Sequence, residues 1–288
     1  MIFLILAILL STSIFIIFRL FPKYNVDNFQ AIIINYVVAV AFGLFISDIP
    51  SSFQELVNRE WFYWSMLVGV IFIVVFYLFA LSSQKAGIAI TAVSSKMSVV
   101  IPVVLGFLYF NEEATVKKIA GIALVLVSFF LLLQKKKGSK INYKYIFLPI
   151  LIFIGNGIND SLNKNVQFEF IQDNTQEYFL YLTVLFAFAL IFGLMISIFR
   201  PKKNRKKINK QTIIGGFVLG IFNYVATLAF IRGLNEMNVS IFIPILNVSI
   251  VSLSAILGLI IFKEELKLKK IIGILIAIIA ILLISEFI

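Results

Sequence analysis

The sequence predicts an all-α integral membrane protein with ten transmembrane helices, built as two inverted five-helix repeats. The membrane class follows from composition, because 61% of the 288 residues are hydrophobic and only 14% are charged. A soluble domain cannot bury that much apolar surface. The repeats follow from one polar phrase that joins two apolar segments and occurs twice, 152 positions apart.

A helix needs about 20 apolar residues to cross about 30 Å of hydrocarbon, and the sequence contains ten segments of roughly this length. These segments are 2–20, 29–47, 62–81, 87–110, 118–133, 145–163, 178–199, 212–232, 239–262 and 270–286. They are continuous rather than alternating, and lipid cannot satisfy exposed backbone groups, so helices are predicted instead of a β-barrel. The first segment lacks a preceding basic region and a small-residue cleavage site, which favours a retained span over a signal peptide.

The basic residues are distributed unequally between the two sets of loops. One set contains 19 of the 25 Lys and Arg residues, including the runs in 134–144 and 200–211, and the other set contains five. Because positively charged loops stay in the cytoplasm, the richer set is predicted to be cytoplasmic and both termini non-cytoplasmic. The net charge of +11 therefore reflects the orientation of the chain in the inner membrane and the contact of its basic loops with membrane lipid. A nucleic acid is not expected as a partner.

The repeated phrase occupies Phe110–Gly121 in the first copy and Phe262–Gly273 in the second. The displacement between the copies contains five spans. Since five is odd, the second copy must cross the bilayer in the opposite sense to the first. We therefore predict two five-helix repeats, 1–135 and 141–288, with a substrate site near the midplane between them.

Each corner carries two glutamates, and they have two interpretations. A carboxylate beside a helix end can cap free N–H groups and favour the helix dipole. Alternatively, the carboxylates form a gate that breaks and re-forms during transport. The glutamates are Glu112 and Glu113 in the first corner, and Glu264 and Glu265 in the second.

With their glutamate-bearing corners and glycine-containing final spans, the two halves resemble EamA-type carriers of the drug/metabolite transporter superfamily. The matching residues are Ile101, Pro102, Gly106, Phe110, Glu112, Glu113 and Gly121, with their counterparts Ile243, Pro244, Gly258, Phe262, Glu264, Glu265 and Gly273. The resemblance covers the whole chain and carries no information on the substrate. Members of this family commonly keep both termini in the cytoplasm, which is the opposite of the orientation predicted from charge.

Polar side chains inside the apolar segments mark helix contacts or a water-filled path. Grouped by helical spacing, they suggest a set of residues that line a substrate cavity. The candidates are Asn35, Tyr36, Ser95, Lys96, Asn156, Asn159, Asp160, Asn223, Thr227 and Asn247. Packing is the favoured role for single small residues such as Gly216 and Gly220. The aliphatic segments 118–133 and 270–286 are expected to face lipid or a second copy in a homodimer, and Trp61 and Tyr63 to form part of an interfacial aromatic belt.

Two charges lie well inside predicted spans, and Lys96 near a span centre costs at least ~2.5–3.5 kcal/mol on insertion scales. Three interpretations stay open. Lys96 and Asp160 form a buried pair, Lys96 binds an anionic group of the substrate, or one of the two loads and releases a proton during transport.

The motifs of the sequence favour transport over catalysis. The sequence has no histidine or cysteine, no His-Glu-x-x-His motif and no nucleotide-binding glycine loop, so neither a metal nor a cofactor is expected. We predict a secondary, non-ATP transporter of a small metabolite, such as an amino acid or organic anion, that works by alternating access. The alternative is a lipid-linked flippase or a non-transporting membrane partner protein; an enzyme is not expected.

Overall fold

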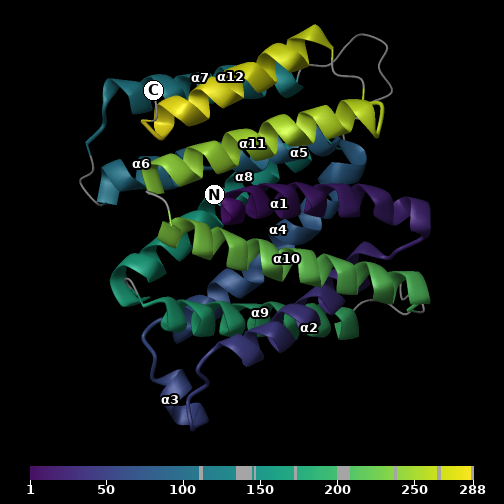
Figure 1. Cartoon of the computed structure of the whole chain (residues 1–288), viewed down its shortest axis with the longest axis vertical. Coiled ribbons are helices and arrows are strands. Elements are labelled where there is room, and N and C mark those ends of the chain that lie inside the picture. Colours follow the sequence, from purple (N-terminus) through teal and green to yellow (C-terminus); the bar gives the residue numbers. More distant parts are fainter. Residues whose placement is uncertain are drawn as a thin grey trace. The chain divides into compact units, whose positions relative to one another are not determined.

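The computed structural model describes residues 1–109, 113–133, 145, 147–171, 174–199, 208–236, 239–264 and 267–286. Every regular element within these ranges is helical (Figure 1). The elements in chain order are α1 (Ile2–Leu20), η1 (Phe21–Tyr24), α2 (Asn28–Ile46), α3 (Phe53–Val57), α4 (Phe62–Lys85), α5 (Ile88–Met97), α6 (Val100–Tyr109), α7 (Val116–Leu133), α8 (Phe147–Val166), the π-helix η3 (Gln167–Ile171), α9 (Thr175–Phe199), α10 (Lys210–Glu236), α11 (Val239–Ile260) and α12 (Leu268–Ile284).

Each of the ten predicted apolar segments coincides with a helix or, in one case, with two consecutive helices. Within the described residues, six candidate spans are long and apolar enough to cross a membrane. These are Ile2–Tyr24, Asn28–Ile46, Phe62–Lys85, Ile88–Leu108, Thr175–Phe199 and Lys210–Gly233. The structure thus confirms the all-helical class, and the count of ten transmembrane helices stays a prediction.

The helices group into two compact units. The first unit consists of Met1–Arg19, Leu78–Ile158 and Val225–Ile288, and the second of Leu20–Tyr77 and Asn159–Tyr224. Each unit therefore takes residues from both predicted sequence repeats. The repeats themselves, 1–135 and 141–288, stay a prediction.

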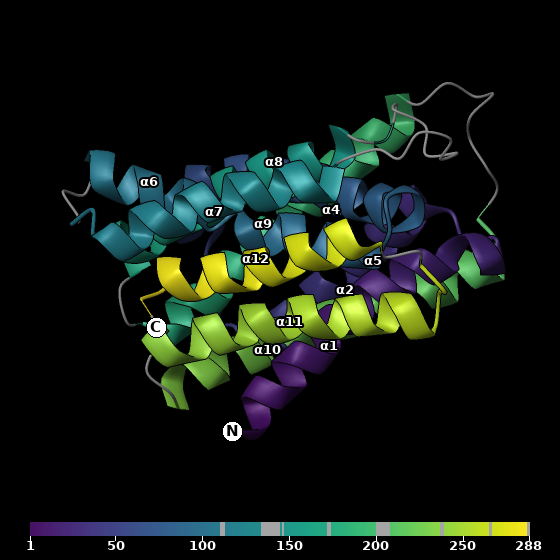
Figure 2. The same cartoon turned by 90° about the horizontal axis from the view of Figure 1, so that it is seen from above.

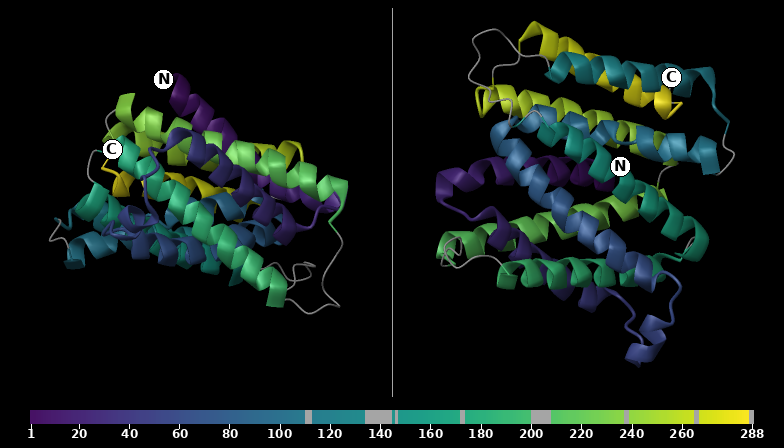
Figure 3. Two further views of the ribbon diagram at one scale, coloured as in Figure 1. Left: turned by 90° about the horizontal axis from the view of Figure 1, so that it is seen from below. Right: turned by 180° about the vertical axis from the view of Figure 1, so that it is seen from behind.

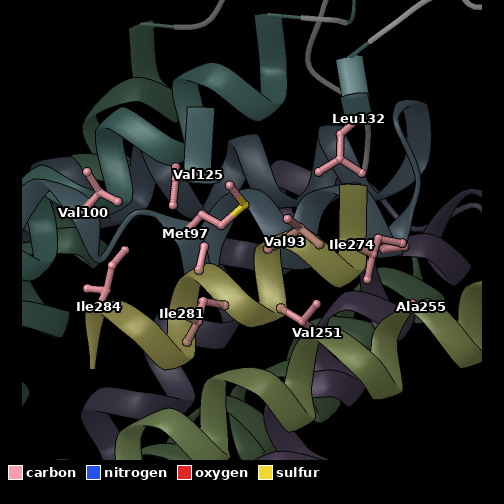
Figure 4. Packing of buried hydrophobic residues seen from close by; sticks show 13 residues of the cluster. Val93, Met97, Val100, Val125, Leu132, Val251, Ala255, Ile274, Ile281 and Ile284 are labelled. Carbon is pink, nitrogen blue, oxygen red and sulfur yellow. The ribbon is translucent and has the colours of Figure 1, made fainter. Parts of the chain in front are cut away.

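The core of the first unit lies among α5, α7, α11 and α12, where aliphatic side chains and Met97 fill the space between the helices (Figure 4). A second buried cluster joins α1 and α11 to the other side of α5 through residues such as Phe15, Ala92 and Phe242. Because α5 contributes to both clusters, almost all of its side chains are buried, including those of its serines and Thr91. This helix is therefore the central element of the first unit.

Helices α7 and α12 pack closely against each other (Figures 1 and 3). A Cβ added at Gly121 would stand 3.0 Å from the Ala280 carbonyl oxygen and 2.6 Å from Ile284 Cγ1. Gly273 contacts α7 in the same way, since its carbonyl accepts a 2.7 Å hydrogen bond from Ser128 and its Cα faces Leu132. Shifting 121, 128 and 132 by 152 gives 273, 280 and 284. The two antiparallel helices therefore contact each other at corresponding positions of the sequence repeat.

In the second unit, α2 packs against α9 and α10 through glycines. A Cβ at Gly43 would stand 2.3 Å from the Thr183 hydroxyl, and a Cβ at Gly216 would stand 2.7 Å from the Ala31 carbonyl oxygen. The Thr183 hydroxyl also hydrogen-bonds Ser47 at 2.8 Å. Helices in lipid are commonly held together by close backbone approach and interhelical hydrogen bonds. The contact at Gly216 confirms its predicted packing role.

Helix α11 ends in a turn that places a lysine in the left-handed region. The Glu264 N–H bonds the Gly258 carbonyl at 2.9 Å, and Lys263 between them has φ 49°. Glycine or asparagine is the usual residue in this left-handed conformation after the end of a helix. The first copy of the phrase has Asn111 at the corresponding place in the sequence.

Replacing Lys263 by glycine is expected to stabilise the protein by roughly 0.5–1 kcal/mol, because the left-handed strain of a non-glycine residue exceeds the entropy cost of glycine. The midpoint of thermal unfolding in detergent measures the change. Lys263→Ala keeps the strain and should show no gain. A midpoint that rises equally in both variants contradicts the explanation.

Candidate functional site

The predicted span 87–110 corresponds to the candidate span Ile88–Leu108, but its helix is interrupted. It folds as α5 and α6, separated by a turn at Ser98–Val99. Pro102 explains the break, because it has no N–H to donate to the Ser98 carbonyl and its ring crowds that carbonyl. The Ile101 N–H instead bonds the Ser98 carbonyl at 2.9 Å, in the tighter i to i+3 pattern. Pro102 is therefore a sequence signal for the break between α5 and α6.

Asn156 of α8 lies against the break. Its Nδ2 donates to the Ser95 carbonyl oxygen at 3.2 Å and to the Ser98 hydroxyl at 2.8 Å, and the Ser98 hydroxyl also donates to the Ser95 carbonyl. Gly157 allows this approach, since a Cβ there would stand 2.4 Å from Ile101 Cδ1. One amide thus supplies hydrogen bonds that the broken helix lacks, and it joins two predicted site residues, Ser95 and Asn156.

Lys96 lies in the last turn of α5 and is half-buried. A cation at a helix C-terminus is stabilised by the helix dipole by about 0.3–1 kcal/mol, and by up to ~2 kcal/mol when partly buried. The break therefore offsets part of the cost of placing this charge inside a span. A continuous helix over 87–110, as the hydropathy predicts, would lack this compensation.

In the second unit the structure joins two other predicted residues. Asn223 Nδ2 of α10 donates to Asn35 Oδ1 of α2 at 3.1 Å, and both side chains are buried. Gly220 brings the helices together, because a Cβ there would stand 3.0 Å from the Asn35 carbonyl oxygen. Within the described part of the chain, Asn35 Nδ2 has no hydrogen-bond partner. It is a fully buried donor that a ligand or water can satisfy.

Tyr36 belongs to an aromatic cluster of the second unit. Its ring lies 6.1 Å from that of Phe186 and 6.1 Å from that of Phe76. The side chain is 0% exposed, and its hydroxyl has no partner among the described residues. Tyr36 therefore faces aromatic side chains of α4 and α9, and Asn35 beside it faces α10.

Three predicted residues lie on α8, on either side of the boundary between the units. Asn156 belongs to the first unit, whereas Asn159 and Asp160 belong to the second. Asn159 is buried and Asp160 is exposed. Lys96 and Asp160 lie in different units, so their pairing stays a prediction.

The remaining two candidates belong to the first unit. Thr227 of α10 is half-buried and Asn247 of α11 is buried. The structure therefore pairs Ser95 with Asn156, and Asn35 with Asn223, by direct hydrogen bonds. The cavity-lining role of all ten candidates stays a prediction.

Trp61 is a residue whose role the sequence interpretation misjudged. It is 2% exposed rather than part of a lipid-facing belt, and its Nε1 donates to Glu177 Oε1 at 2.7 Å. Arg59 forms an ion pair with the same carboxylate at 3.4 Å. The Trp61 ring packs edge-on against Tyr181, whose hydroxyl donates to Asn163 at 2.8 Å. The sequence signal for this network is Glu177, an acidic residue in the first turn of α9. Tyr63, in contrast, is exposed, as expected of a residue in an interfacial belt.

The corner glutamates are described only in part, since Glu112 and Glu265 lie outside the described residues. Glu264 caps a helix, but not the one that follows it in the chain. Its Oε1 accepts the Ile88 N–H of α5 at 2.8 Å. The capping interpretation is thus confirmed for Glu264, with a helix from the other predicted repeat as its partner.

Comparison with known families identifies the chain. The model of the EamA-like transporter family matches residues 1–134 and 173–286. The chain belongs to the EamA-like transporter family. Together with its long apolar helices, this membership makes it a multi-pass membrane protein of the drug/metabolite transporter superfamily.

Two relatives extend the comparison. An uncharacterized protein of Haemophilus influenzae (strain ATCC 51907 / DSM 11121 / KW20 / Rd) is 27% identical over 288 residues, covering 96% of this chain and 95% of its own. A crystal structure described only as that of a protein superposes with a TM-score of 0.59 at 11% identity, covering 98% of each chain. The latter likeness concerns the fold alone. Helix α8 lies between the two stretches matched by the EamA-like family, so the match carries no information on Asn156.

Proposed function

We propose that this EamA-like protein is a secondary, non-ATP transporter of a small metabolite with an anionic group, such as an amino acid or another organic anion. One observation carries the proposal: a membrane-spanning segment is broken near its middle, and a half-buried lysine, Ser95 and Asn156 gather at the break. Broken helices supply polar backbone groups at the midplane of many transporters, where substrate and coupling ions bind.

The proposed mechanism is alternating access between two inverted five-helix halves. Its support is the 152-residue repeat and the reciprocal, antiparallel contacts of α7 with α12. The charge distribution of the loops supports an inner-membrane orientation with both termini outside. A reporter fused after Ile288 tests this orientation, and a cytoplasmic signal would reverse it.

The exposed faces of α7 and α12 are apolar and carry residues such as Leu126, Phe130 and Leu275. We propose that these faces contact lipid or a second copy of the chain. The mass of the detergent-solubilised protein distinguishes the two arrangements.

Counterflow in liposomes tests the function. Purified protein is reconstituted and loaded in turn with amino acids, organic anions, sugars, nucleotides and lipophilic cations, and the exchange of labelled solute is measured. Saturable exchange of an anionic or zwitterionic solute is the expected result. If folded, inserted protein exchanges none of them, transport is rejected. Stabilisation by lipid-linked compounds but not by metabolites would favour the flippase alternative.

Lys96→Gln is expected to lower exchange of that solute about tenfold or more, because a charged hydrogen bond is worth about 1.5–3 kcal/mol. The unfolding midpoint is measured alongside, so that loss of protein is not mistaken for loss of transport. Lys117→Gln, an exposed change at the start of α7, serves as the matched control. Unchanged exchange in folded Lys96→Gln protein removes both the substrate-binding and the proton-carrying roles of Lys96.

A further inference from the structure

The Glu264 carboxylate binds at the first turn of α5. Helices α5 and α11 contact each other (Figure 2), and the turn after α11 directs Glu264 back over its own helix. Its Oε1 accepts the Ile88 N–H at 2.8 Å across 176 positions of sequence. A carboxylate bonded to a backbone N–H is a charge-assisted hydrogen bond, which is shorter and stronger than a neutral one.

Two glycines from different segments leave the space for this carboxylate. A Cβ at Gly258 or at Gly87 would stand 2.8 Å from Glu264 Oε2. Gly87 has φ +106°, a conformation that L side chains rarely adopt. The backbone around Glu264 thus accommodates its carboxylate closely.

The neighbouring end of α4 is held in a complementary way. The Arg19 guanidinium donates to the carbonyl oxygens of Ser83 and Gln84, and it lies 6.0 Å from the Phe262 ring centroid. A cation therefore caps the carbonyl end of α4, and an anion caps the amide end of α5, on the two sides of the short turn between them. Both charges complement the dipole of the helix they contact.

Helix α5 is short, and a turn separates it from α4 at one end and from α6 at the other. It has ten residues, about 15 Å at 1.5 Å per residue. Glu264 holds its first residue, and Asn156 holds the turn after its last one. Ser95 and Lys96 lie in the last turn, so their position depends on where α5 is held.

We propose that Glu264 is a positioning residue for the candidate site: by binding the N-terminus of α5, it sets the place of Ser95 and Lys96 at the other end of this half-helix. The proposal rests on the proposed function, because it takes the α5 break as the transport site. In this proposal Glu264 does more than cap α5, because the cap also fixes the position of the candidate site.

Thiol labelling tests the proposal without a known substrate, because the chain contains no cysteine. Ser95→Cys is introduced alone and together with Glu264→Ala or Glu264→Asp, and the full chain is reconstituted in liposomes. The labelling rate of the single thiol by a small methanethiosulfonate reagent is measured. In the Glu264→Ala background we expect about a tenfold faster rate, as for the loss of one charge-assisted hydrogen bond. In Glu264→Asp, which keeps the carboxylate, the increase should be smaller.

Two controls separate positioning from general destabilisation. Glu286 accepts a 2.7 Å hydrogen bond from Thr115, so Glu286→Ala removes a comparable carboxylate from the start of α7 instead of α5. Ser65→Cys is a buried probe in the second unit. The proposal is supported if labelling accelerates at Ser95→Cys and not at Ser65→Cys, and if the increase is largest with Glu264→Ala, smaller with Glu264→Asp and absent with Glu286→Ala.

An unchanged Ser95→Cys rate in Glu264→Ala overturns the proposal. Equal acceleration of Ser65→Cys, or of Ser95→Cys by Glu286→Ala, overturns it as well, since either result indicates general loosening. The labelling test measures no transport. A failure of the counterflow experiment therefore rejects the proposed function, and a failure of labelling rejects the role of Glu264.

Discussion

Gly121→Leu is expected to separate α7 from α12 and to destabilise the protein by about 1–3 kcal/mol or more, as overpacking does. A Cβ at Gly121 would stand 3.0 Å from the Ala280 carbonyl oxygen and 3.1 Å from the Ile284 nitrogen. Both are backbone atoms of α12 and cannot rotate aside. The fraction of monodisperse protein after heating, followed by size-exclusion chromatography in detergent, measures the loss.

The reciprocal site sharpens this prediction. At Gly273 an added Cβ meets side-chain atoms, the nearest being Leu132 Cγ at 3.1 Å. Because side chains can repack, Gly273→Ala should cost less than Gly121→Ala although the two positions correspond in the repeat. Ala120→Leu, one residue away on the exposed face of α7, is the control and should have little effect. If Ala120→Leu and Gly121→Leu are equally harmful, the close contact is not the cause.

Asn223→Leu is expected to destabilise the second unit by about 1–3 kcal/mol, because it leaves the buried Asn35 Oδ1 without its donor. Asn35 Nδ2 already has no partner among the described residues, so the variant would leave an entire buried amide unsatisfied. Unfolding of the purified protein by temperature or denaturant, followed for each variant, measures the change.

A double-mutant cycle isolates the amide pair. Asn35→Leu alone should also be costly, and Asn35→Leu with Asn223→Leu should cost less than the sum of the two. The expected coupling is about 0.6 kcal/mol and at most about 1.7 kcal/mol, the average and the maximum found for interhelical hydrogen bonds in a membrane protein. Strictly additive losses would show that the 3.1 Å contact contributes nothing to stability.

The positions of the helices were predictable, because apolar runs of about 20 residues and their polar corners are local features of the chain. The predicted segments 29–47 and 270–286 lie within two residues of α2 and α12 at each end. The break in 87–110 could have been predicted as well, since Pro102 is visible in the sequence. It was missed because hydropathy alone does not register one lost hydrogen bond.

The partners of the polar residues were much less predictable. Helical spacing placed Asn35 and Asn223 on candidate faces, but only packing brought them to 3.1 Å. Trp61 looked like a belt residue because it begins an apolar segment, and its burial depends on Glu177, 116 positions away. Such contacts depend on which helix faces which, and local sequence does not specify that.

By itself, the sequence determined that this protein is a bundle of apolar helices with a repeated glutamate corner, and these features placed it in its family. Composition and periodicity are sufficient for that, because lipid allows a chain of this kind few alternatives to helix. Only the tertiary structure decided that Glu264 caps α5 and that Asn156 bridges the break. The physical reason is that a hydrogen bond depends on ångström-scale distance and direction between elements far apart in the chain.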